Sequence, residues 1–134
     1  MDDLPIPVTA ARAPKAVGPY SQAVRYGGLL FVSGCLGLDP ATGSLAEGLE
    51  AQAERALANL EAILRAAGTD AGRVLKTTVF LRDMGAFDAV NAVYAGHFRP
   101  PFPARSCVEV GRLPRNAEVE IEAVAALTEA AGSR

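Results

Sequence analysis

The longest regular pattern along the chain is a stretch of apolar residues at helical spacing, from Leu49 to Ala67. Apolar positions recur there at steps of three and four residues, and most charged side chains fall off that stripe. Gly68 follows directly, as glycine often does beyond the end of a helix. The pattern therefore predicts an amphipathic helix that buries one side.

A second, shorter helix is predicted after Asp83, a residue type that caps helix starts. It is expected to reach Phe98, because the prolines that follow cannot continue a helix. Its apolar side consists of Phe87, Val90 and Tyr94. Both helices thus have one side suited to covering a sheet.

Three other stretches have the character of strands. The run VLKTTVFL at Val74–Leu81 is rich in β-branched residues, which indicates a central strand. Two apolar runs flank Gly27 and Gly28, so a hairpin is predicted over Ala23–Gly34. Weak alternation over Ile6–Ala11 predicts an edge strand.

Two further strands are predicted near the C-terminus. In the first, polar or thiol side chains occupy alternate positions, namely Arg105, Cys107 and Glu109, and Ser106, Val108 and Val110 lie between them. In the second, three glutamates alternate with three apolar residues: Glu118, Glu120 and Glu122 with Val119, Ile121 and Ala123. If the two strands are neighbours, one sheet face is apolar and the other carries Arg105, Cys107, Glu109 and the glutamates.

This order of elements predicts an α+β fold in which two helices cover one face of a mixed sheet. No internal repeat or linker interrupts the chain, so residues 1–134 are expected to form a single domain. The opposite sheet face has two interpretations. It is solvated, which the pattern alone favours, or it packs against copies of the same chain, with Arg105 and Glu120 in a shared cleft.

Composition narrows the classes of function. Half of the residues are apolar, and the net charge is −2, which argues against broad attraction to nucleic acid or to an anionic membrane. No apolar run approaches the roughly 20 residues of a membrane span, and the start MDDLPIP resembles neither a signal nor a transit peptide. With only two cysteines, far apart, a reducing compartment is expected and the protein is predicted to be cytoplasmic.

The sequence lacks the residues that several common types of active site require. One histidine, His97, and two scattered cysteines do not make the usual zinc site, so no metal is expected. The sequence has no GxSxG, Walker or GxGxxG motif. Chemistry would have to depend on Arg, Glu, Tyr, Ser, Cys or backbone groups.

Several blocks of the sequence resemble the RidA family, also called YjgF or reactive intermediate deaminases. They include GPYSQAV (18–24), VNAVY (90–94), FPARSCVEV (102–110) and LPRNAEVEIEAVA (113–125). The likeness spans about residues 13–126. It implies a chorismate-mutase-like subunit with a six-stranded sheet and a homotrimer with sites between subunits. It also implies hydrolysis, without a cofactor, of small enamine and imine products of pyridoxal-phosphate enzymes, such as 2-aminoacrylate.

The resemblance also assigns roles to two residues. Arg105 is the family's carboxylate-binding residue, and its planar fork suits that task; from the pattern alone, an ion pair with Glu120 or Glu122 is the better interpretation. Glu120, first of the glutamate pair in VEIEA, is expected to position and deprotonate the attacking water. Glu118 and Glu122 are expected to be ordinary surface groups.

Four more residues match family positions that border the cleft: Tyr20, Ser33, Asn91 and Cys107. Cys107 is expected to line the site rather than act as a nucleophile, because no base lies near it in sequence. The chain departs from the family pattern at Cys35, Gly37 and Ala92, which bears on the range of substrates.

Two other functions remain open at this point. Family members have been described as RNA- or protein-binding proteins that inhibit translation or act like chaperones, but the basic residues here are dispersed and nucleic acid is an unlikely partner. A relative that kept the fold and lost the chemistry is the other alternative. The retained Arg105 and Glu120 argue against it.

Overall fold

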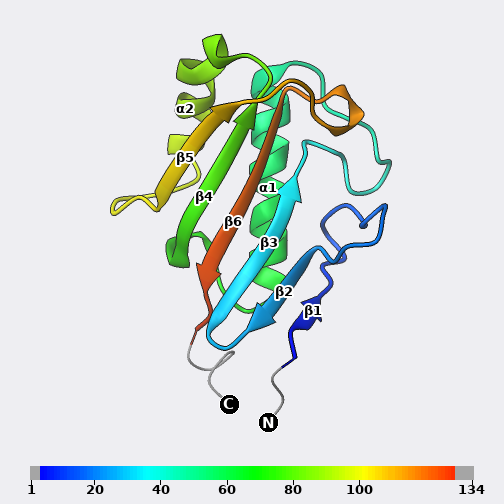
Figure 1. The fold of residues 1–134 in the computed structure, drawn as a ribbon, viewed down its shortest axis with the longest axis vertical. Helices are drawn as coiled ribbons and strands as arrows, with labels where there is room; N and C mark the ends of the chain where they lie inside the picture. The colour runs from blue at the N-terminus through cyan, green and yellow to red at the C-terminus, as the bar shows by residue number, and fades with distance from the viewer. Residues whose placement is uncertain (1–3, 129–134) are drawn as a thin grey trace.

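The computed structural model describes residues 4–128, which form one six-stranded sheet with both helices on one face (Figure 1). The strands lie in the order β1-β2-β3-β6-β4-β5. Their bounds are Ile6–Val8 (β1), Ala23–Tyr26 (β2), Leu29–Cys35 (β3), Val74–Leu81 (β4), Ala104–Glu109 (β5) and Val119–Ala126 (β6). The α+β fold with a mixed sheet is confirmed, because β4 and β5 are parallel and the other neighbours antiparallel.

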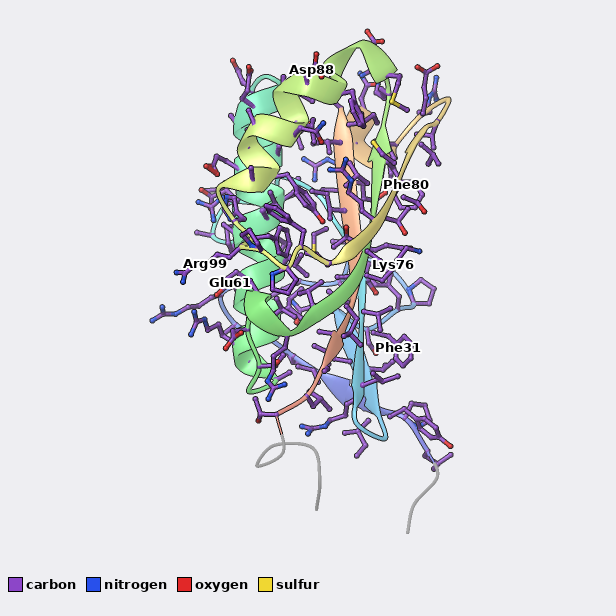
Figure 2. The ribbon with its side chains drawn as sticks, turned by 90° about the vertical axis from the view of Figure 1, so that its left-hand side faces the viewer. Phe31, Glu61, Lys76, Phe80, Asp88 and Arg99 are labelled. Carbon is purple, nitrogen blue, oxygen red and sulfur yellow. The ribbon has the colours of Figure 1, made fainter. Side chains whose placement is uncertain are left out.

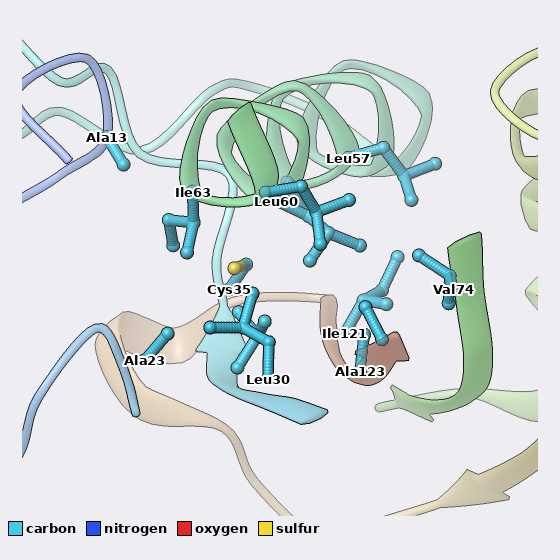
Figure 3. Close-up of a cluster of buried hydrophobic side chains, with 14 of the residues drawn as sticks. Ala13, Ala23, Leu30, Cys35, Leu57, Leu60, Ile63, Val74, Ile121 and Ala123 are labelled. Atoms are coloured by element: carbon cyan, nitrogen blue, oxygen red, sulfur yellow. The ribbon is translucent and has the colours of Figure 1, made fainter. Parts of the chain in front are cut away.

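Helix α1, Leu49–Ala66, supplies most of the helical side of the core. Its buried side includes Leu57, Leu60 and Ile63, which pack on residues such as Leu30 and Ile121 of the central strands (Figure 3). The predicted helix is confirmed to within one residue at its end. Gly68 then has a φ of 84°, a backbone conformation that favours glycine.

Helix α2, Phe87–Ala95, is shorter than predicted at both ends. The carboxylate of Asp83 caps a single 3₁₀ turn instead, Met84–Ala86, by accepting a hydrogen bond of 2.9 Å from the Gly85 amide. Val90 and Tyr94 are buried as predicted, whereas Phe87 is 36% exposed. Within the described residues, neither helix is long and apolar enough to cross a membrane.

The two C-terminal strands are not neighbours. Strand β6 lies between β3 and β4, and β5 lies at the edge of the sheet beyond β4. Thr77 of β4 is opposite both Arg105 and Ala123, and it is fully buried on the helix side. Phe80, on the other face, is opposite both Val108 and Glu120.

The expected single polar face is therefore wrong. Arg105 and Cys107 share the helix-covered face with the apolar residues of β6, while Glu120 and Glu122 lie on the opposite face. The alternation within each strand was identified correctly from the sequence. The neighbour of each strand in the sheet was not predicted correctly, and this neighbour decides whether the polar sides of two strands lie on the same face.

The face of the sheet opposite the helices has no covering layer among residues 4–128. Figure 2 shows Phe31, Lys76 and Phe80 pointing away from the helices on that side. Phe31 is 42% exposed, with Leu29 and Tyr26 exposed near it, and Val108, on the edge strand β5, is 40% exposed. We call this surface the open face. It mixes apolar side chains with Glu120 and Glu122, a composition typical of a surface that meets another protein chain.

The turn after β3 packs tightly against α1, which gives the first prediction. A β-carbon at Gly37 would lie 2.5 Å from the carbonyl oxygen of Gln52 and 2.7 Å from its Cα, both part of rigid helix backbone. Gly37→Ala should therefore lower the free energy of unfolding by about 1–3 kcal/mol, measured by urea denaturation at fixed protein concentration. Gly111→Ala is the control, because a β-carbon there meets no atom within 4 Å. Equal denaturation midpoints for the two variants would contradict this account.

Candidate active site

Arg105 lies at the exposed edge of the sheet, where α2 holds its guanidinium. Its Nη1 donates a hydrogen bond of 2.8 Å to Oδ1 of Asn91. Its Cζ lies 4.9 Å from the ring centre of Tyr94 and 5.5 Å from that of Phe87. These three partners stand at positions 87, 91 and 94, a spacing that places them on one side of a helix.

This arrangement leaves most of the guanidinium available. The two rings attract the cation through their faces and occupy none of its N–H groups. Within residues 4–128, Asn91 is the hydrogen-bond partner of Arg105, so the other donors of the fork remain for a ligand. A planar carboxylate is the group that such a fork binds with two parallel hydrogen bonds.

Cys107 follows on the same side of β5 and is half-buried against the core. Burial raises the pKa of its thiol, and the positive charge of Arg105 opposes that rise. A raised pKa disfavours the thiolate, which is the nucleophilic form. The surroundings of Cys107 thus disfavour a nucleophilic thiolate, and its role in lining a site stays a prediction.

Glu120 lies in a different place, on the other face of the sheet, where it lines a cleft of about 530 Å³ that also reaches Asn59 and Ile63 of α1. The cleft also contains Tyr20, Ser33 and Gly34. It forms where the pairing of β3 with β6 shifts between Val32 and Cys35. Such an irregularity in a sheet often accompanies a site, because it re-aims side chains and frees backbone groups.

The side chain of Glu120 lies against Gly34. A β-carbon at residue 34 would come within 2.8 Å of Cδ of Glu120, so only glycine leaves room for the carboxylate in this position. Partial burial raises the pKa of Glu120, and the negative charge of Glu122 raises it further. A carboxyl group with a raised pKa exchanges protons more readily near neutral pH. The buried Cys35 beside it has a pKa raised to about 12, so its thiol stays protonated.

Ser33 and Tyr20 form one wall of this cleft. The Ser33 hydroxyl donates a hydrogen bond of 2.7 Å to the carbonyl of Ser21. The Tyr20 hydroxyl accepts a hydrogen bond of 3.3 Å from the Val17 amide, and 51% of the residue is exposed. Each side chain is therefore held by a backbone group of the segment that precedes β2, and both border the cleft.

The predicted site residues thus fall into two groups that one chain does not bring together. Arg105, Asn91 and Cys107 form the first group, at the β5 edge on the helix side. Tyr20, Ser33 and Glu120 form the second, in the cleft. Because Arg105 and Glu120 belong to opposite sheet faces, a small molecule bound to one is out of reach of the other within the same chain.

Sequence reasoning missed the residues that build the surroundings of both groups. Phe87 and Tyr94 were identified only as core residues, although their spacing with Asn91 was visible in the sequence. No sequence pattern could reveal the space that Gly34 leaves for Glu120, because that space depends on which strands pair.

His97 lies away from both groups of site residues. Its Nε2 is 2.6 Å from Oε1 of Glu54. Among the described residues, no three His, Cys, Asp or Glu side chains gather as a metal site.

Comparison with known proteins finds a family whose sequence pattern this chain matches. The profile of the endoribonuclease L-PSP family matches residues 10–127. A RutC family protein of Sinorhizobium fredii is 57% identical over 91% of this chain and 98% of its own length. A protein of Salmonella typhimurium named 2-iminobutanoate/2-iminopropanoate deaminase is 47% identical over 88% of this chain and 94% of its own length.

A solved structure extends the comparison to three dimensions. The crystal structure of TdcF from E. coli with bound serine has a TM-score of 0.85 and 39% identity. The alignment covers 91% of this chain and 98% of TdcF. Most of this chain therefore shares its fold with that protein.

The pKa of Glu120 provides a second prediction. Since the charge of Glu122 raises it, Glu122→Gln should lower the pKa of Glu120. Titration of the Glu120 side-chain carboxyl by ¹³C NMR would measure the shift, with Glu120→Gln identifying the signal. Glu118→Gln is the matched control and should leave the pKa of Glu120 in place. An unchanged pKa in Glu122→Gln would show that the two carboxylates do not interact.

Proposed function

The chain belongs to the endoribonuclease L-PSP family, which includes the RidA and YjgF proteins, and we propose that it hydrolyses small 2-imino acids to 2-keto acids and ammonia. Substrates of this class include 2-iminopropanoate, with its enamine tautomer 2-aminoacrylate, and 2-iminobutanoate. The similarity to proteins named for this reaction supports the proposal. We propose further that the active unit is a trimer with one site at each junction between subunits.

The observation that carries the proposal is the separation of Arg105 and Glu120 onto two faces of one sheet. Each residue has surroundings built for a ligand: the open fork of Arg105 and the cleft beside Glu120. Packing the open face of one subunit against the β5 edge of the next would unite them. It would also cover Phe31 and Val108, which are otherwise exposed.

In this scheme the substrate carboxylate binds to the fork of Arg105, and Asn91 fixes the orientation of that fork. The imine carbon then faces the neighbouring subunit's cleft. Glu120, in its ionised form, takes a proton from a water molecule there, and the water oxygen forms a bond to the imine carbon. The same carboxyl group returns this proton to the nitrogen, which gives a carbinolamine. It then takes the proton of the new hydroxyl group and delivers it to the amine nitrogen, so that the carbonyl forms as the carbon–nitrogen bond breaks, and ammonia and the keto acid leave.

The remaining residues shape this site. Tyr20 and Ser33 border the substrate on the cleft side, and Cys107 lines the Arg105 side. The raised pKa of Glu120 suits a group that must both accept and return a proton. The scheme needs no metal or organic cofactor, because the substrate already contains an electrophilic carbon.

An RNA-cleaving role, which the family's description names, has less support from this chain. Its net charge is −2, and the two glutamates of the cleft, Glu120 and Glu122, offset the two basic residues, Lys15 and Arg115, so the cleft offers phosphate no net positive charge. Arg115 at the cleft rim donates a hydrogen bond to the carbonyl of Gly43. We therefore propose the small-molecule reaction alone.

Replacing the fork of Arg105 tests the first half of the site. Arg105→Lys keeps the charge and loses the two parallel hydrogen bonds, so kcat/KM for 2-iminobutanoate should fall about 10- to 100-fold. A coupled assay with freshly generated imine measures turnover, and circular dichroism checks the fold. Normal turnover in this variant would remove Arg105 from the proposed role.

Mixing two inactive variants tests the shared site. Arg105→Ala and Glu120→Gln should each be inactive alone. In a ring of three that contains both, one junction still joins an intact Arg105 to an intact Glu120. Unfolding and refolding an equal mixture should therefore restore about a quarter of wild-type turnover. Each variant refolded alone is the control, and a mixture without activity would contradict a site built from two subunits.

A further inference from the structure

Two hydroxyl groups beneath Arg105 form a hydrogen bond that the proposed reaction does not use. Oγ1 of Thr77 lies 2.7 Å from Oη of Tyr94, and both atoms are buried. Thr77 has no exposed surface, and Tyr94 is 5% exposed. Net stabilisation by a bond between neutral groups is modest, but leaving either hydroxyl unpartnered at such a position is costly.

The position of this pair links it to Arg105. Thr77 and Arg105 are opposite each other in the parallel pairing of β4 and β5, and they share the helix-covered face. The Tyr94 ring descends from α2 onto that face, where its centre lies 4.9 Å from Cζ of Arg105. The hydroxyl bond thus anchors the far end of the ring on whose face the guanidinium rests.

The ring is held from three sides. Phe98 contacts it at 4.6 Å between ring centres, Thr77 binds its hydroxyl, and Arg105 covers its face. Burial raises the pKa of the Tyr94 hydroxyl, so it remains neutral, which suits a hydrogen bond to another hydroxyl. The ring that lies against the guanidinium is thus also hydrogen-bonded to Thr77 through its hydroxyl.

From this geometry we propose that Thr77 and Tyr94 are positioning residues for the carboxylate fork of Arg105. The inference rests on the proposed binding of a substrate carboxylate by Arg105. Asn91 fixes one nitrogen of the fork, and the anchored ring fixes its plane. The two contacts together present the remaining N–H groups in one direction, as bidentate binding of a carboxylate requires.

Paired substitutions test this role. Thr77→Val keeps the shape of the side chain and removes its hydroxyl, and Tyr94→Phe keeps the ring and removes its hydroxyl. Each should raise KM for 2-iminobutanoate about three- to tenfold, the effect of one lost hydrogen bond, with a smaller change in kcat. The dissociation constant for the product 2-oxobutanoate should rise by a similar factor in calorimetry.

The double variant and a rescue show whether the two hydroxyls act as a unit. Thr77→Val combined with Tyr94→Phe should bind 2-oxobutanoate no more weakly than the weaker single variant, because the second change removes a group already unpartnered. Thr77→Ser keeps the hydroxyl and should stay close to wild type. Additive losses in the double variant would overturn the proposal.

A matched control separates positioning from stability. Thr69 is also buried, and its hydroxyl donates a hydrogen bond of 2.8 Å to the carbonyl of Ala126, away from Arg105. Thr69→Val should lower thermal stability and leave KM and product binding unchanged. If Thr77→Val and Tyr94→Phe behave in the same way, both residues are structural only and the proposal is wrong.

An NMR measurement without substrate tests the positioning role independently of the proposed reaction. The Nε–H signal of Arg105, identified by its loss in Arg105→Lys, reports the order of the guanidinium without any substrate. Its order parameter should fall in Thr77→Val and Tyr94→Phe and stay unchanged in Thr69→Val. An unchanged value in the first two variants overturns the inference. If the order parameter falls in these variants but the protein does not hydrolyse imines, the positioning role stands and the proposed reaction is refuted.

Discussion

The register between three neighbouring strands is the constraint on which the candidate site depends. Because Thr77 is opposite both Arg105 and Ala123, Arg105 must share the face of the apolar residues of β6. Glu120, one position away from Ile121, must then lie on the other face. Alternation in a strand allows no intermediate arrangement, since moving a side chain to the other face requires a slip by a whole residue. The division of the site into two groups is therefore built into the sheet.

The same sheet leaves one face covered by helices and the other without cover within residues 4–128. The covered face receives the apolar sides of α1 and α2, and this supplies the core. The open face combines exposed aromatic and aliphatic residues with the cleft that holds Glu120. In the proposed trimer, a second copy of the chain would cover this apolar surface and complete the site through the same contact. The fold and the proposed function thus lead to one assembly.

Much of this fold was predictable from the sequence, because local patterns determine elements. The stripe of α1 and the β-branched run of β4 gave bounds that agree with the structure within one residue. The central position of β6 was not predictable, since alternation identifies a strand without naming its partner. For the same reason, Arg105 and Cys107 were expected on the wrong face. Resemblance to a family supplied the candidate residues, while the supports of Arg105 and the space at Gly34 needed coordinates.

The place of β6 has a consequence for how the protein is made. This strand lies in the middle of the sheet, yet it is the last described strand along the chain. During synthesis, β3 and β4 therefore have no shared neighbour until residues 119–126 have left the ribosomal exit tunnel. Until then their apolar edges are unpaired, and such edges favour aggregation. The sheet should therefore close only after β6 has emerged, with β3 and β4 exposing unpaired edges until that step.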